Sequence, residues 1–262
     1  MRDVLFAVLL VGGIGLLIGI ILAVASIIFA VPKDEKAEAI AEVLPGANCG
    51  ACGFSGCAGY AKALSEGKAK VGLCSPGGEE TAKAVAALLG VEAGSMEKTA
   101  AVVHCMGSED KTERKMDYRG IKTCAAAAMM YGGTGKCSYG CMGFGDCAAV
   151  CEYDAVRICN SVAQIDKDKC RACSKCVEAC PHGLISILPV KRQAVVKCSN
   201  CDKGAQTRKD CKVGCIGCMK CVKVCKSGAV RIENLHAVVD PAKCTGCAMC
   251  EQECPQKCII VL

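Results

Sequence analysis

The sequence predicts an α+β protein built from an N-terminal transmembrane helix, a small helical metal-binding domain and two tandem cysteine-ligated modules. Three observations support this class: 27 of the 262 residues are cysteine, a charge-free apolar run opens the chain, and the C-terminal half is an internal repeat. The chain has no Trp, four Phe and five Tyr, so few large rings are available for a core. Metal groups held by cysteine are expected to take the place of much of that core.

The apolar run extends from Val4 to Val31 and predicts an anchor over residues 1–32 that contacts membrane lipid through residues 4–31. It exceeds the roughly 20 residues that span a bilayer and the roughly 7–15 of a signal-peptide core, which is the alternative. Arg2 precedes the run, and Lys33 and Lys36 follow it. The lysines and the many free thiols indicate a single-pass protein of the cell (inner) membrane with its body on the cytoplasmic side.

The first cysteine group has the spacing C-x2-C-x4-C-x16-C and consists of Cys49, Cys52, Cys57 and Cys74. Its glycines allow the positive φ and close backbone approach that an iron-sulfur cluster requires. Residues 58–66 and 79–89 are expected to be helices around this loop, within a 4Fe-4S domain of residues 33–100 followed by a connector of residues 101–123. Zinc is the alternative, because four thiolates also suit a tetrahedral zinc site. An odd cysteine count and the chain length argue against a disulfide framework.

A shift of 74 residues places nine cysteines on nine others without a gap, from Cys124 on Cys198 to Cys180 on Cys254. The surroundings agree, since "CEYDAVRI" matches "CKSGAVRI" and "IDKDKCRACSKCVEACP" matches "VDPAKCTGCAMCEQECP". This indicates two modules, residues 124–188 and 198–262, joined by a linker of residues 189–197. Between paired cysteine runs, "AVRICNSVAQID" and "AVRIENLHAVVD" predict β-hairpins, and "LISIL" and "CIIVL" predict closing strands.

Within each module the motifs are those of a two-cluster bacterial ferredoxin, with runs of C-x2-C-x2-C-x3-C. In this arrangement the fourth cysteine of each run ligates the other cluster. The predicted ligand sets are Cys170, Cys173 and Cys176 with Cys151; Cys215, Cys218 and Cys221 with Cys254; and Cys244, Cys247 and Cys250 with Cys225.

One site departs from this pattern because Phe144 stands where the repeat has Cys218. The simplest assignment lets Cys137 substitute, joining Cys141, Cys147 and Cys180, and the alternative is a degenerate site without a cluster. The total is then about five [4Fe-4S] clusters. A sixth cluster or another metal remains open, with five tentative extra ligands: Cys198, Cys201, Cys211, Cys105 and Cys124.

The composition excludes several functions. The formal net charge of +6 comes from basic residues scattered among acids without an aromatic platform, which argues against nucleic acid as a partner. There is no dinucleotide motif in a strand-turn-helix setting, and "YGGTG" lacks the context of a phosphate loop. No catalytic residue and no nucleotide or flavin site is expected, so the chain is predicted to transfer electrons.

The leading apolar helix, "NCGACGFSGC" and the two ferredoxin modules together resemble the B subunit of the Rnf complex over essentially the whole chain. "KCSYGCMGFGDC" and "DKGAQTRKDCKVGCIGC" look like the joining stretches of clostridial-type members, which carry the duplicated module. The first cysteine group alone also resembles a domain of corrinoid iron-sulfur proteins, although no corrinoid-sized domain follows it.

The resemblance implies an electron-transfer subunit of an ion-translocating ferredoxin:NAD oxidoreductase. Such a subunit would accept low-potential electrons from reduced ferredoxin and pass them to the other membrane and peripheral subunits of the Rnf complex, which move Na+ or H+. Two rival functions remain: a membrane-tethered polyferredoxin of another dehydrogenase or hydrogenase, and a zinc-stabilised interaction protein without redox activity.

Overall fold

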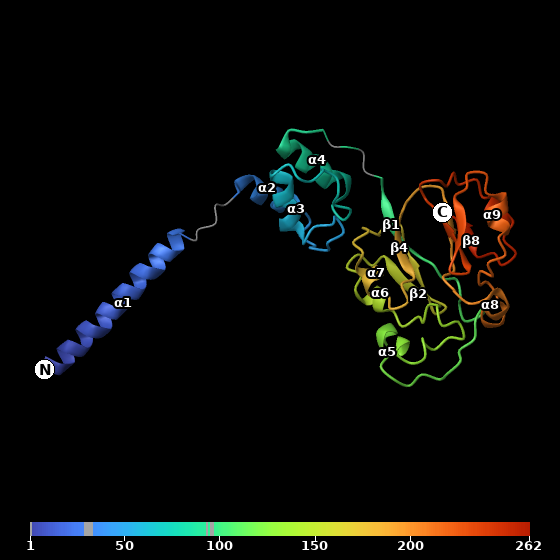
Figure 1. The fold of residues 1–262 in the computed structure, drawn as a ribbon, viewed down its shortest axis with the longest axis horizontal. Helices are drawn as coiled ribbons and strands as arrows, with labels where there is room; N and C mark the ends of the chain where they lie inside the picture. The colour runs from blue at the N-terminus through green and yellow to red at the C-terminus, as the bar shows by residue number, and fades with distance from the viewer. Residues whose placement is uncertain (1, 29–33, 93, 95–96) are drawn as a thin grey trace.

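The computed structural model describes residues 2–28, 34–92, 94 and 97–262 of the chain (Figure 1). The helices of this part are α1 (Arg2–Ile28), α2 (Glu35–Val43), α3 (Cys57–Ser65), α4 (Gly78–Leu89), α5 (Cys124–Ala128), α6 (Asp146–Ala149), α7 (Lys175–Glu178), α8 (Gly204–Asp210), α9 (Lys220–Val224) and α10 (Met249–Gln252). Its strands are β1 (Thr99–Val103), β2 (Val156–Cys159), β3 (Val162–Ile165), β4 (Ile185–Pro189), β5 (Ala194–Val196), β6 (Val230–Glu233), β7 (His236–Val239) and β8 (Ile259–Val261).

Helix α1 coincides with most of the predicted anchor, and its large apolar side chains, such as Phe6 and Leu16, are exposed. Among the described residues, however, no helix is long and apolar enough to cross a membrane, so the predicted transmembrane helix is wrong. Residues 1 and 29–32 of the predicted anchor lie outside the described residues.

Helices α2, α3 and α4 form a small domain whose core contains Ile40, Tyr60, Leu64 and Val85. The α3 and α4 helices confirm those expected near residues 58–66 and 79–89. The Tyr60 hydroxyl donates to the Lys70 carbonyl at 2.8 Å and accepts from the backbone N–H of residue 73 at 3.2 Å. One buried phenol therefore fixes the loop that leads to the last cysteine of the first group.

Each C-terminal module combines a terminal two-stranded sheet with a hairpin, and all four pairings are antiparallel. The terminal sheets pair β1 with β4 and β5 with β8. The predicted hairpins are confirmed as β2–β3 and β6–β7. Both turns use two residues of positive φ, Asn160–Ser161 and Asn234–Leu235, as the twist of a two-residue hairpin loop requires.

Strand β1 crosses the predicted boundary between the 4Fe-4S domain and the connector, and strand β5 lies in the segment expected to be a linker. In the two terminal sheets, Val103 pairs with Ile185 and Val196 pairs with Ile259. Since Ile185 and Ile259 are repeat equivalents, Val103 corresponds to Val196. The two modules therefore align with an extra segment in the first module, between Cys105 and Cys137.

The two modules are joined through His104 and Thr112. The His104 Nδ1 atom lies 2.8 Å from the Val196 carbonyl, so it donates, and Nε2 accepts from the Ser186 hydroxyl at 2.6 Å. Burial lowers the pKa of this imidazole, which fits the neutral form that these two bonds require. Thr112 Oγ1 donates to the carbonyl of residue 210 at 2.7 Å.

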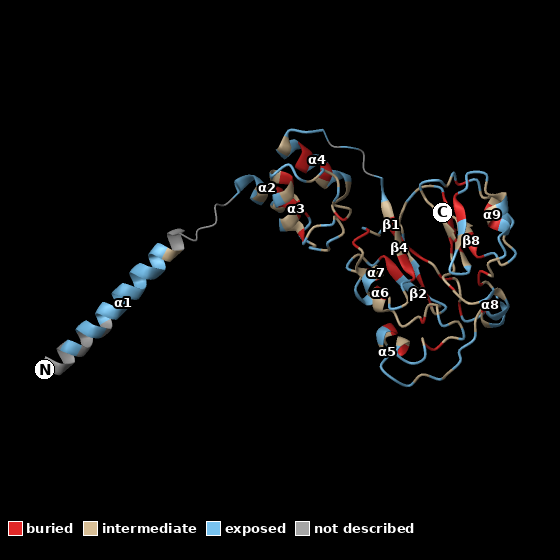
Figure 2. Cartoon of the chain, in the orientation of Figure 1, coloured by how far each residue is buried: buried red, intermediate tan, exposed pale blue. Residues whose placement is uncertain are grey.

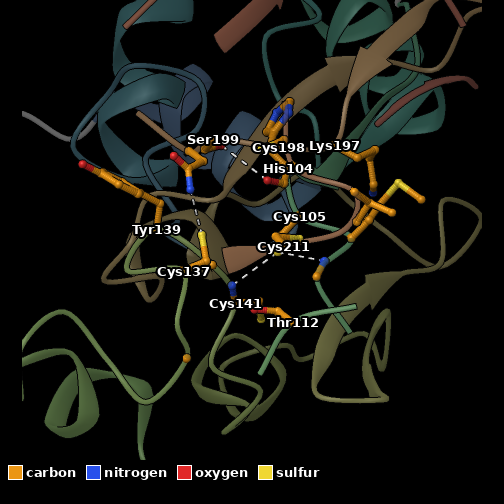
Figure 3. Close-up of a pocket in the computed structure, with 17 residues that line it drawn as sticks. His104, Cys105, Thr112, Cys137, Tyr139, Cys141, Lys197, Cys198, Ser199 and Cys211 are labelled. Atoms are coloured by element: carbon orange, nitrogen blue, oxygen red, sulfur yellow. Dashed lines mark hydrogen bonds between the residues drawn. The ribbon is translucent and has the colours of Figure 1, made fainter. Parts of the chain in front are cut away.

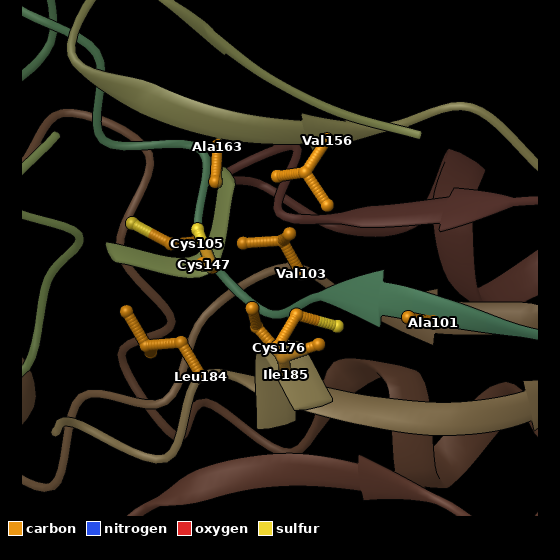
Figure 4. Packing of buried hydrophobic residues seen from close by; sticks show 9 residues of the cluster. All are labelled: Ala101, Val103, Cys105, Cys147, Val156, Ala163, Cys176, Leu184 and Ile185. Atoms are coloured by element: carbon orange, nitrogen blue, oxygen red, sulfur yellow. The ribbon is translucent and has the colours of Figure 1, made fainter. Parts of the chain in front are cut away.

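Cysteines take up much of the two module cores. Figure 2 places buried residues on β4, β8 and the neighbouring strands, and Figure 4 shows Cys105, Cys147 and Cys176 packed with Val103, Val156 and Leu184 in the first module. The second module repeats this composition, with buried cysteines among small aliphatic side chains.

Candidate metal centres

Of the 27 cysteines, 24 gather into six groups of four, named here groups 1 to 6. Group 1 is Cys49, Cys52, Cys57 and Cys74; group 2 is Cys151, Cys170, Cys173 and Cys176; group 3 is Cys124, Cys141, Cys147 and Cys180; group 4 is Cys105, Cys137, Cys198 and Cys211; group 5 is Cys215, Cys218, Cys221 and Cys254; and group 6 is Cys225, Cys244, Cys247 and Cys250.

Group 1 lines one cavity at the start of α3, as the sequence predicts. The Asn48 side chain accepts the backbone N–H of Cys57 at 2.8 Å, and Asn48 has a positive φ of 44°. At Gly56, with φ of 126°, a Cβ atom would lie only 2.8 Å from the Asn48 Oδ1 atom. Glycine is therefore required here so that the asparagine can hold the ligand loop against the helix.

Groups 2, 5 and 6 contain the residues that the ferredoxin spacing predicts. The four thiols of group 2 line one cavity. Burial raises the pKa of Cys176 to about 11, and its three group 2 neighbours add to the rise. Burial likewise raises the pKa of Cys221 to about 11, with contributions from the other thiols of group 5. In group 6, burial and the neighbouring thiols raise the pKa of Cys250.

A left-handed residue precedes four short helices, α6, α7, α9 and α10, each of which carries one cysteine of groups 2, 3, 5 or 6. Ser174, Met219 and Ala248 have φ values of 65°, 62° and 65° and lie at the N-caps of α7, α9 and α10. A left-handed non-glycine residue costs roughly 1–2 kcal/mol, so other interactions of the folded chain, such as a group bound by the cysteines, must offset this cost. Gly145, with φ of 91°, repeats the turn at α6, where Phe144 has replaced a cysteine.

Group 3 differs from the sequence assignment, because Cys124 lines its cavity together with Cys141, Cys147 and Cys180, and Cys137 does not. Burial raises the pKa of Cys147 to about 12, and the Cys141 and Cys124 thiols add to it. The Asp146 carboxylate accepts the backbone N–H groups of Cys124 and Ala125 at 2.8 and 3.0 Å, which fixes the first turn of α5. The extra segment of the first module thus supplies a thiol where Phe144 offers none.

Group 4 lies between the modules, and Cys137 lines its cavity (Figure 3). A Cβ atom built on Gly107 would lie 3.6 Å from both the Cys105 and the Cys211 Sγ atoms, so these thiols face the same point. The Cys137 and Cys198 thiols line the same cavity. The Asn200 side chain donates to the Cys137 Sγ atom at 3.3 Å.

The contacts of Cys105 and Cys198 show that they are structural equivalents. The backbone N–H of Cys141 donates to Cys105 at 3.4 Å, and that of Cys215 donates to Cys198 at 3.2 Å. Because Cys141 and Cys215 are themselves repeat equivalents, each module contributes one of these thiols from the end of its first strand. Burial raises the pKa of Cys105 and raises that of Cys198 to about 12.

Three cysteines stand outside the six groups. Cys159 is exposed. The Cys201 Sγ atom lies 4.0 Å from the His236 Nδ1 atom, away from the group 4 cavity. Cys258 is buried, with its Sγ atom 3.6 Å from that of Cys254, and this contact lowers the pKa of Cys254 to about 5.

The thiols suit a multi-iron cluster. The four thiols of each of groups 1 to 4 line one shared cavity. Backbone N–H groups donate to several of these sulfur atoms, among them Ala101 and Ala172 to Cys170 at 3.3 and 3.4 Å. Such donors favour the thiolate that a four-iron cluster needs.

Sequence reasoning missed the exchange of Cys124 and Cys137, and also the supporting roles of Asn48, Asp146 and Asn200. The shift of 74 residues aligns Cys124 with Cys198 and so hides the extra segment. A signal was nevertheless present, because the joining stretches carry more cysteines than two ferredoxin motifs use.

Three family models match parts of the chain. The FeS model, an Fe-S cluster domain, matches residues 44–76, which include group 1. A 4Fe-4S binding domain matches residues 162–185, and a 4Fe-4S dicluster domain matches residues 214–258. The chain therefore carries an Fe-S domain in its small helical part and [4Fe-4S] domains in both modules.

Curated relatives match nearly the whole chain, and all three described here are B subunits of ion-translocating complexes. The chain is 41% identical to that of the Na(+)-translocating ferredoxin:NAD(+) oxidoreductase complex of Acetobacterium woodii, over 99% of this chain and 78% of the relative. It is 38% identical to that of the ion-translocating oxidoreductase complex of Methanosarcina acetivorans, over 97% of this chain and 96% of the relative. It is also 38% identical to that of the proton-translocating ferredoxin:NAD(+) oxidoreductase complex of Clostridium ljungdahlii, over 97% of this chain and 91% of the relative.

Proposed function

Because the chain belongs to the B subunits of ion-translocating ferredoxin:NAD oxidoreductase (Rnf) complexes, we propose that its six cysteine groups form one continuous electron path. Family and domains make the chain an iron-sulfur electron relay of that complex, and so an electron-transfer subunit of an oxidoreductase. Each of the six groups would hold one [4Fe-4S] cluster, and a bound cluster takes up and releases one electron at low potential. The observation that carries this proposal is the position of group 4, between the modules.

The first step of the path joins the small helical domain to the first module. Burial raises the pKa of Cys173, and the neighbouring thiols of Cys49 and Cys151 raise it further. Cys49 also contributes to the raised pKa of Tyr153, for which burial is the larger cause. Because Cys49 belongs to group 1 and Cys173 to group 2, the proposed path passes from group 1 to group 2.

The next steps cross the first module and leave it. Cys176 of group 2 is among the thiols that raise the pKa of Cys147 in group 3, after burial and nearer thiols. Cys141 of group 3 lines the group 4 cavity as well, and its backbone N–H donates to Cys105. Groups 2 and 3 thus share one core through Cys176 and Cys147, and groups 3 and 4 are joined through Cys141.

The last steps run through the second module. The backbone N–H of Cys215 in group 5 donates to Cys198 in group 4 at 3.2 Å. Groups 5 and 6 share one core, in which Cys221 and Cys250 are buried together. The order from group 1 to group 6 is the order in which we propose that electrons pass, in either direction.

The proposed partners follow from the names of the relatives. Reduced ferredoxin would be the electron donor, and other Rnf subunits would receive the electrons. The complexes of these relatives translocate ions, so the chain would work at a membrane, with its thiols facing the reducing cytoplasm. The relatives are named for different coupling ions, Na(+) and the proton.

An anaerobic reductive titration tests the relay. The full chain, purified with its iron, should accept about six electrons, one for each cluster. The readout is the loss of visible absorption with added low-potential reductant, followed by reoxidation. Uptake of no electrons would contradict the relay, and uptake of about five would contradict a cluster at group 4. Reduced ferredoxin should serve as reductant in the same assay, and a failure limited to ferredoxin would overturn only the proposed donor.

A further inference from the structure

The two modules are duplicates, yet one buried position beside a cysteine group differs in chemistry. Leu184 and Cys258 are equivalent, because the backbone N–H groups of His104 and Lys197 donate to their respective carbonyls, both at 2.7 Å. Leu184 is 2% exposed and Cys258 is 1% exposed. Both side chains therefore lie in the core, one as a hydrocarbon and the other as a thiol.

The Cys258 thiol contacts a ligand residue of group 5. Its Sγ atom is 3.6 Å from the Sγ atom of Cys254, within hydrogen-bond distance for sulfur. In the first module, Cys180 takes the place of Cys254, and there the backbone N–H of Leu184 donates to sulfur at 3.4 Å. The leucine side chain cannot donate. The second module thus has a side-chain donor beside its ligand that the first module lacks.

We propose that Cys258 is a positioning residue that holds an S–H donor on Cys254 and makes group 5 easier to reduce than it would be with leucine there. This inference rests on the proposed cluster at group 5. Hydrogen bonds to cluster sulfurs are among the factors that set reduction potential. A donor stabilises the negative charge that a ligand sulfur gains on reduction, so the midpoint potential rises.

The alternative is that Cys258 is itself a ligand. Group 5 already has four thiols without it, as its repeat equivalent does with leucine at this position. The duplication therefore favours Cys258 as a neighbour of the ligands and not as a ligand. If so, groups 3 and 5, which are repeat equivalents, would differ in reduction potential because of this one side chain.

Cys258→Leu, which copies the first module, tests this inference in the full chain. An anaerobic potentiometric titration followed by electron paramagnetic resonance should show one cluster shifted to a more negative midpoint and the others unchanged. Iron per chain should stay at the wild-type value. Cys258→Ser keeps a donor and should lie nearer to wild type, while Leu184→Cys should shift one cluster of the first module to a more positive midpoint.

Several outcomes would overturn the inference. Unchanged midpoints in both Cys258→Leu and Leu184→Cys would remove the donor role. Loss of about four iron atoms in Cys258→Leu would make Cys258 a ligand. A similar shift of every cluster would indicate a general structural effect. Failure of the proposed function is separate, because it would appear in the wild-type chain as missing iron or missing electron uptake.

Discussion

Removing the iron from the chain should unfold both C-terminal modules. Their cores are small aliphatic side chains and thiols, and the whole chain contains no Trp and four Phe. The left-handed residues Ser174, Met219 and Ala248 cost roughly 1–2 kcal/mol each, and without bound clusters their turns lose a major source of stabilisation. Metal-binding free energy is folding free energy in small domains of this kind.

Circular dichroism and limited proteolysis before and after anaerobic chelation measure this effect. We expect cleavage sites to appear throughout residues 99–262 in the iron-free chain. The control is the same chelator saturated with iron, which should leave the digestion pattern unchanged. An iron-free chain that keeps its native spectrum and its protease resistance would contradict the claim that clusters replace the aromatic core.

Replacing Cys211 by alanine should remove the group 4 cluster and divide the electron path in two. The expected loss is about four iron atoms per chain, with about five electrons accepted in place of six. Cys211 lies in the cavity that joins the modules, so electron exchange between the two halves should show the largest loss among single-site variants. Iron analysis and stopped-flow reduction measure the two effects.

Double variants test which thiols share a site. Cys211→Ala with Cys137→Ala should lose no more iron than either single variant, because both residues belong to group 4. Cys211→Ala with Cys124→Ala should lose about eight iron atoms, because Cys124 belongs to group 3. Cys159→Ser is the matched control, since this exposed thiol belongs to no group. Additive losses for Cys137 and Cys211 would instead restore Cys137 to the group 3 assignment.

Local spacing made much of the site predictable. Groups 2, 5 and 6 each take three thiols from one run of C-x2-C-x2-C, so a short loop fixes their geometry and the sequence states it directly. Group 1 is similar, with Cys49, Cys52 and Cys57 in one glycine-rich loop. The hairpins were predictable for the same reason, because a two-residue turn sets the pairing of its own strands.

The remaining assignments depend on contacts between distant segments. Strands β1 and β5 pair with strands that end their modules, so their place in the fold is not encoded locally. The extra segment between Cys105 and Cys137 places Cys124 in the group 3 cavity and Cys137 in the group 4 cavity. The membrane-spanning prediction failed for a different reason. It was made from the length and hydropathy of an apolar run in the sequence, whereas no helix among the described residues is long and apolar enough to cross a membrane.

Iron, acid-labile sulfide and zinc measured together on the anaerobically purified chain test the central claim, six [4Fe-4S] clusters in one path. We predict about twenty-four iron and twenty-four sulfide per chain with little zinc. About twenty of each would contradict the claim that all six groups hold a cluster. Zinc with negligible sulfide would contradict the electron relay itself.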